Sequence, residues 1–289
     1  MKEFEILPFR VEECLNKCFE QKIEENDFSV LFQKGNIREQ IFDILECFCT
    51  IVYFPLKSEA DNNGFKLTDV PSTNGKKESF VFINTSQTIE KQVFTAAHEL
   101  GHIWDVDEYV LNELGEELNL ESTTDVREEI VNRFAALLLM PKDEFLKTYD
   151  YVYKKFADKE GNISIINMIR VIVELMNQFL TPYKSIVYRL VELGKIYKET
   201  GELLLGQREI REDTIFKARD EIISQSGFTH LLIANERKWI YGLTDLISRA
   251  EKSGLAHPEK IRKLQEAFDL TPATGSNEIS LPIKTQEEE

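Results

Sequence analysis

The chain of 289 residues is 42% hydrophobic and 30% charged, the composition of an ordinary globular protein with one sizeable core. Its 51 acidic residues outnumber 35 basic ones and give a formal net charge of -16, which repels phosphate backbones and disfavours nucleic acid as a partner. No apolar run approaches the roughly 20 residues of a membrane span, and the acidic start lacks the apolar stretch of a signal peptide. We therefore expect a cytoplasmic protein without a membrane partner. The sequence leaves its oligomeric state open.

Four cysteines are present, at Cys14, Cys18, Cys47 and Cys49. Neither close pair has the two-residue spacer that is usual in a zinc knuckle. A long chain without a secretory signal also argues against disulfides. We expect four reduced, buried thiols without a chemical role.

The first half of the chain is predicted to hold a small sheet of three strands. Two helices come first, at Phe9–Phe19 and Ile37–Cys47, where apolar residues recur at three- and four-residue spacings. Three β-branched or aromatic segments are predicted as strands: Thr50–Phe54, Phe65–Leu67 and Phe80–Asn84. Pro55 follows the first of them, which favours a position near an edge of the sheet.

Two strong helices follow the predicted strands. The first spans about Thr88–Asp105, and its apolar residues at spacings of four, three and four make one buried stripe. An acidic connection, Val106–Asp125, is expected next. The second helix runs from about Asp125 to Met140, where Pro141 stops it.

Beyond residue 150 the chain is predicted to be wholly helical up to a polar tail. The expected helices are Ile163–Phe179, Thr181–Leu193, Glu209–Ser224, Lys238–Lys252 and Pro258–Phe268. Thr181 and Pro182 form a start signal, with a capping hydroxyl followed by proline in the first turn. Residues 271–289 are polar, end in three glutamates and are predicted to be a disordered acidic tail.

One motif carries chemistry, and it lies in the helix at Thr88–Asp105. His98 and His102 are one turn apart on one helix face, where two imidazoles can share a zinc ion. Glu99 is offset from them, so it is predicted to accept a proton from a water as a general base rather than to ligate. A chance surface trio is the alternative. The apolar flanks argue against that alternative, and Gly101 in a buried helix suggests the close approach of another backbone.

A hydrolytic zinc site needs a third protein ligand, and we predict Glu128. Glu128 shares a helix face with Asn132, which is placed one turn later to orient a ligand histidine. The other acids nearby lie mostly in the acidic connection and are expected to be solvated charges. Glu129 points about 100° away from Glu128 and remains the reserve choice.

Two segments that carry these residues resemble the ImmA/IrrE metallopeptidases. They are Phe94–His102 and Glu128–Pro141, and the similarity covers roughly residues 50–145. One departure is that Ile130 and Val131 replace a Glu-Ala pair common in the family. The resemblance implies an α+β, zincin-like core with a small three-stranded sheet and an active-site helix, followed by a helical C-terminal region. It also implies one Zn²⁺ per chain on His98, His102 and Glu128.

The chain is predicted to divide into four segments, of which the resemblance does not explain residues 200–289. Residues 1–150 would form the metallopeptidase domain, and residues 151–204 a helical, helix-turn-helix-like region. A helical C-terminal region at 205–270 and the tail at 271–289 would follow. Within the second segment, Tyr183, Lys184 and Arg189 could contact DNA, but the acidic chain favours a packed helix pair that supports the peptidase or docks its substrate.

Family members cut a helix-turn-helix repressor, so the resemblance implies a zinc-dependent, site-specific endopeptidase. Its protein substrate would be such a repressor, and cleavage would switch on stress, mobile-element or phage-related genes. The alternative is a non-catalytic, antitoxin-like or sensor module with a structural zinc. The presence of Glu99 favours the enzyme, because a structural zinc site has no need of a general base.

Overall fold

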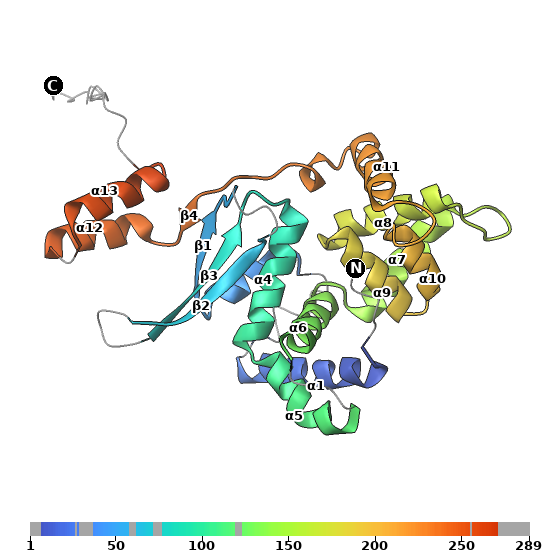
Figure 1. Ribbon diagram of the computed structural model, residues 1–289, viewed down its shortest axis with the longest axis horizontal. Coiled ribbons are helices and arrows are strands. Elements are labelled where there is room, and N and C mark those ends of the chain that lie inside the picture. The colour runs from blue at the N-terminus through green and yellow to red at the C-terminus, as the bar shows by residue number, and fades with distance from the viewer. Residues whose placement is uncertain are drawn as a thin grey trace, which may run out of the picture. The chain divides into compact units, whose positions relative to one another are not determined.

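A computed structural model describes residues 7–26, 28, 37–57, 62–71, 77–118, 123–254 and 256–270. The chain divides into two compact units, residues 1–240 and 241–289. The predicted α+β class is confirmed: a small mixed sheet is accompanied by helices (Figure 1). The four-part division stays a prediction, and the predicted tail lies outside the described residues. Among the described helices, none is long and apolar enough to cross a membrane.

The sheet contains the three predicted strands and a fourth that was predicted to be helical. The strands are β1 (Thr50–Phe54), β2 (Gly64–Pro71), β3 (Lys77–Asn84) and β4 (Trp239–Ile240), in the order β2-β3-β1-β4. β1 runs parallel to β3 and antiparallel to β4, while β2 runs antiparallel to β3. β1 is therefore an inner strand. Pro55 lies just beyond its end, where the missing N–H interrupts no ladder.

Side chains attach β4 to the sheet although it has only two residues. The rings of Tyr53 and Trp239 lie 5.7 Å apart. The Arg237 guanidinium lies 4.4 Å from the centre of the first ring and 4.5 Å from that of the second. Thr85 Oγ1 donates a hydrogen bond of 2.7 Å to the carbonyl of Arg237. The prediction that the chain beyond residue 150 is wholly helical is wrong here, because the strand depends on contacts between residues more than 150 positions apart.

The predicted helices of the first unit are present, together with helices at Lys142–Phe156 and Lys198–Leu204 that were not predicted, and one expectation needs correction. They are α1 (Phe9–Glu25), α3 (Gln40–Glu46), α4 (Ile89–Ile103), α5 (Val106–Leu118), α6 (Thr124–Leu139), α7 (Lys142–Phe156), α8 (Ile165–Phe179), α9 (Tyr183–Glu192), α10 (Lys198–Leu204) and α11 (Glu212–Gln225). The correction is α5, which occupies most of the expected acidic connection. Val106, Val110 and Leu114 recur every four residues and are buried, so this segment is an amphipathic helix with an acidic outer face.

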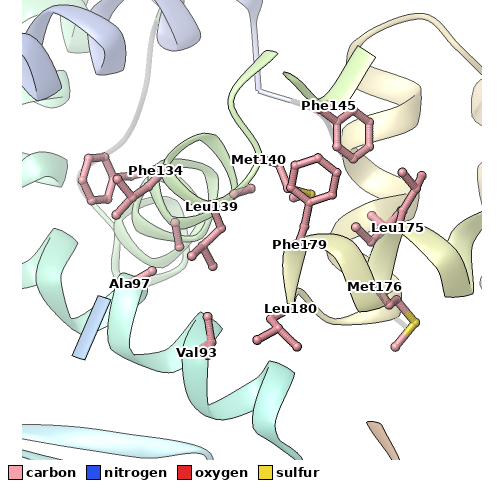
Figure 2. Packing of buried hydrophobic residues seen from close by; sticks show 14 of the residues in the cluster. Val93, Ala97, Phe134, Leu139, Met140, Phe145, Leu175, Met176, Phe179 and Leu180 are labelled. Carbon is pink, nitrogen blue, oxygen red and sulfur yellow. The ribbon is translucent and has the colours of Figure 1, made fainter. Parts of the chain in front are cut away.

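Two of the three residues of the α8–α9 pair that were considered for DNA contact are packed into the core, and the third, Lys184, is exposed and pairs with Glu212. Tyr183 and Arg189 are 2% and 1% exposed. Figure 2 shows Phe179, at the end of α8, close to Phe145, and the two rings are 5.3 Å apart. Buried side chains cannot reach a phosphate backbone, so the interpretation as a supporting helix pair fits this structure.

The second unit is small. It contains α12 (Leu243–Ser253) and α13 (Pro258–Ala267), which contact each other. Leu243, Ile247 and Ile261 are its buried apolar residues among those described.

Four buried charges join α1, α6 and α9, and we call them the ion network. Arg133 Nη2 donates to Glu12 Oε2 at 2.9 Å, and Arg133 also pairs with Glu192. Arg189 Nη1 lies 3.4 Å from a carboxylate oxygen of each glutamate. All four side chains are at most 7% exposed. Two positive and two negative charges balance, which is the arrangement that buried ions require.

α4 and α6 approach each other closely at Gly101. A Cβ atom built there would lie 2.9 Å from Val131 Cγ1 and 3.0 Å from Phe134 Cδ1. The sequence suggested a neighbouring backbone, and the structure instead places two side chains of α6 against the glycine. Because α4 also packs on β2 and β3, this contact fixes the distance between α6 and the sheet.

We predict that Gly101→Val lowers the free energy of unfolding by about 1–3 kcal/mol, because overpacking forces α4 and α6 apart. Urea denaturation measures the effect. Combining it with Val131→Ala, which removes the nearest methyl group, should lose less stability than the sum of the two single changes. Strict additivity would show that the two side chains do not compete for the same space.

We also predict that Arg133→Met lowers the free energy of unfolding by about 3–5 kcal/mol, because Glu12 and Glu192 then share only Arg189 and one of the two buried negative charges is left unbalanced. The matched control is Arg262→Met. Arg262 pairs with Glu266 across one turn of α13, and both side chains are about half exposed. The control should change stability by less than about 1 kcal/mol, and equal losses in the two variants would contradict a structural role for the ion network.

Candidate metal centre

α4 and α6 bring three ligand-type side chains together. The Nε2 atoms of His98 and His102 lie 3.0 Å apart on one face of α4. Glu128, from α6, places one carboxylate oxygen 3.2 Å from His98 Nε2 and the other 3.5 Å from His102 Nε2. One ligand atom from each of the three residues lies within 4.8 Å of the others. Two imidazoles and a carboxylate form a donor set that suits a divalent metal ion.

Asn132 fixes the orientation of the His98 ring. Its Oδ1 lies 3.0 Å from His98 Nδ1. An amide oxygen can only accept, so the proton of the neutral ring sits on Nδ1 and the lone pair on Nε2 points towards Glu128 and His102. The expected placement of Asn132 against His98 is confirmed, and the role of His98 as a metal ligand stays a prediction. A ring held in this tautomer is prepared to bind a metal ion at Nε2.

The protein favours the neutral form of both histidines. Burial lowers the pKa of His98, and the neighbouring charge of His102 lowers it further, although Glu128 opposes the shift. Burial likewise lowers the pKa of His102, and Glu128 again opposes. Neutral imidazole is the form that coordinates metals, so near pH 7 both rings are ready to ligate without first losing a proton.

Glu99 is beside the three ligand-type residues but is not one of them. It is 6% exposed, and burial raises the pKa of its carboxyl group to about 7. The positive charge of Lys66 lowers that pKa and the negative charge of Glu128 raises it. A carboxyl group with a pKa near 7 can both accept and return a proton at neutral pH, which is what a general base needs.

Lys66 was not among the residues predicted for this site, and the structure places it at the edge of the site. Its Nζ donates a hydrogen bond of 3.2 Å to the carbonyl oxygen of His102, at the C-terminal end of α4. Lys66 belongs to β2 and is 36 residues from that carbonyl. Lys66 reaches the site because β2 packs on α4, and no local sequence pattern predicts a contact of this kind.

A pocket of about 300 Å³ adjoins the centre on the side of Asn132. Its wall combines aromatic and polar side chains of α4, α6 and α9, among them Phe94, Glu129, Tyr188 and Glu192. Glu129, the reserve choice for the third ligand, therefore faces this pocket. It does not belong to the three-residue cluster found among the described residues.

Comparison with known protein families identifies a match. Residues 49–191 match the model of a peptidase family described as the IrrE N-terminal-like domain. The matched segment begins at the end of the first helical region and ends inside α9, so it contains β1 to β3, α4, α6 and every residue of the pocket wall except Glu192. No curated protein and no solved structure matches the chain.

We predict that the purified chain binds about one divalent ion and that Glu128→Ala weakens this binding by at least tenfold, because an oxygen donor is lost. Glu129→Ala is the matched control, since it removes the adjacent carboxylate on the same helix. Metal titration followed by elemental analysis measures both. Equal weakening by the two variants, or a stronger effect of Glu129→Ala, would exclude Glu128 as the third ligand.

Proposed function

The chain belongs, over residues 49–191, to the IrrE N-terminal-like domain family of peptidases, and from this premise we propose that it is a zinc-dependent, site-specific endopeptidase. The cluster of His98, His102 and Glu128 carries the proposal. We assign these three residues as ligands of one Zn²⁺ per chain and Glu99 as the general base. When bound, the ion supplies Lewis acidity, which acidifies water and polarises a peptide carbonyl.

The residues around the ligands have separate tasks in this proposal. Asn132 holds His98 in the tautomer that presents Nε2. Glu99 accepts a proton at its carboxylate and later returns it to the departing amine, as microscopic reversibility allows. The half-open pocket beside Asn132 is placed to receive part of the substrate chain, with α9 as its outer wall.

We propose that the substrate is a helix-turn-helix repressor and that its cleavage switches on stress, mobile-element or phage-related genes, with the reaction taking place in the cytoplasm. Two considerations support this choice. The resemblance described above implies it, and a net charge of -16 favours encounter with a basic, DNA-binding protein. Nucleic acid itself is not an expected partner, since Tyr183 and Arg189 are buried.

The alternative is a non-catalytic binding module, antitoxin-like or a sensor, in which zinc is structural. Glu99 argues against it. Burying the carboxylate of Glu99 is unfavourable because the group loses its hydration. A structural zinc site, which is closed by its ligands, has no use for such a group.

We predict that Glu99→Gln reduces cleavage of the repressor by about 10²–10⁴-fold while metal content and folding persist, because the variant lacks only the proton acceptor. Cleavage of the co-expressed repressor, followed by mass analysis of its fragments, measures the effect. Glu90→Gln is the matched control: Glu90 is also buried on α4 but accepts from Thr88 and is not part of the cluster.

Gene expression separates the enzyme from the binding module. We expect the wild type and Glu90→Gln to derepress the target genes and Glu99→Gln to leave them silent. Derepression by Glu99→Gln, with the repressor intact, would mean that the protein acts by sequestration and that the hydrolytic assignment is wrong.

A further inference from the structure

A second pocket of about 300 Å³ lies away from the metal centre, between α1 and another face of α6. Its wall is largely apolar, made by Leu15, Phe19, Phe134, Leu137, Leu138 and Pro141. The volume is at the lower end of the range for small-molecule sites. Neither a predicted site residue nor a proposed ligand of the metal lines it, so the proposed function leaves this pocket unexplained.

Two members of the ion network, Glu12 and Arg189, also form part of this wall. Arg189 makes both of its ion-pair contacts, each of 3.4 Å, through Nη1. Its Nε and Nη2 are buried and have no hydrogen-bond partner among the described residues. An unsatisfied buried donor is unfavourable by about 1–3 kcal/mol, so this edge of the guanidinium calls for an acceptor that the described chain does not supply.

The geometry of the unpartnered edge selects the acceptor. Nε–H and one N–H of Nη2 point the same way and form the side-on fork of the guanidinium, which matches the two oxygens of a carboxylate. The ion network is already neutral, with two positive and two negative charges, so the positive charge of Arg189 is already balanced and an entering anion needs another cation. Lys142 lies on the wall and can balance an entering anion, while Glu13, also on the wall, disfavours one of high charge.

We propose that this pocket binds a small monocarboxylate with an apolar tail. The carboxylate pairs with the Nε/Nη2 edge of Arg189, and the tail lies against the leucines and phenylalanines of α1 and α6. An amine of the same length would meet the fork with a positive charge and leave the donors unsatisfied. A dianion would be repelled by Glu12 and Glu13.

Isothermal titration of the full chain with octanoate tests the proposal. We expect one octanoate per chain and no binding of octylammonium, which has the same tail and the opposite charge. Leu137→Trp fills the pocket from α6 without touching the ion network, and it should abolish octanoate binding. Leu264→Trp, on the surface of α13, is the matched control and should bind octanoate like the wild type.

Arg189→Gln tests the head group, with thermal denaturation to confirm folding. We expect octanoate binding to weaken about tenfold or more, because a charge-assisted pair is lost. If that variant does not fold, the Leu137→Trp result and the octylammonium comparison decide. Equal binding of octanoate and octylammonium, no octanoate binding at all, or full binding by Leu137→Trp would each overturn the proposal.

Discussion

The closeness of α4 and α6 at Gly101 is the constraint on which the rest of the molecule depends. His98 and His102 belong to one of these helices and Glu128 to the other, so their separation is set by how closely the two helices pack. With no side chain at residue 101, Val131 and Phe134 can fill the space against α4. The same helical residue that lowers intrinsic helix stability therefore allows the three ligand-type atoms to converge.

The ion network holds the far side of α6 in a comparable way. Arg133 follows Asn132 directly in the sequence, so the residue that orients His98 is next to one that is anchored to α1 and α9. A buried ion network stabilises a fold little more than apolar packing would, but it allows only the one arrangement of its helices in which every charge is paired. In this protein that specificity fixes the rotation of α6, which decides that Glu128 and not Glu129 faces the histidines.

Much of the fold and the centre could be predicted from local patterns. The three strands, α4 and α6 follow from β-branched runs and from helical spacing, and the motif around Glu99 follows from residues one turn apart. The rest depends on tertiary contacts. In α5, many acidic residues made the helical spacing of its buried apolar residues hard to recognise. The two-residue strand β4 is stabilised by Tyr53 and Arg237, which no local pattern predicts. Lys66 reaches the site from a separate strand, β2. The assignment of the ligands themselves rests on proximity and stays a prediction.

The exposure of the cluster is uneven, and this unevenness bears on the kind of chemistry that the site can perform. The side chains of His98 and His102 are 16% and 21% exposed, whereas that of Glu128 is 47% exposed. A structural metal site is closed by its ligands, while a catalytic one keeps one side open to solvent and substrate. Here the two histidines of α4 lie on the buried side of the cluster, and Glu128 of α6 lies on its exposed side. The pocket that Asn132 lines is next to them. Glu99 is buried in α4, so the proton acceptor of the proposed reaction lies on the closed side of the cluster, while the exposed Glu128 lies on the side that a substrate would approach.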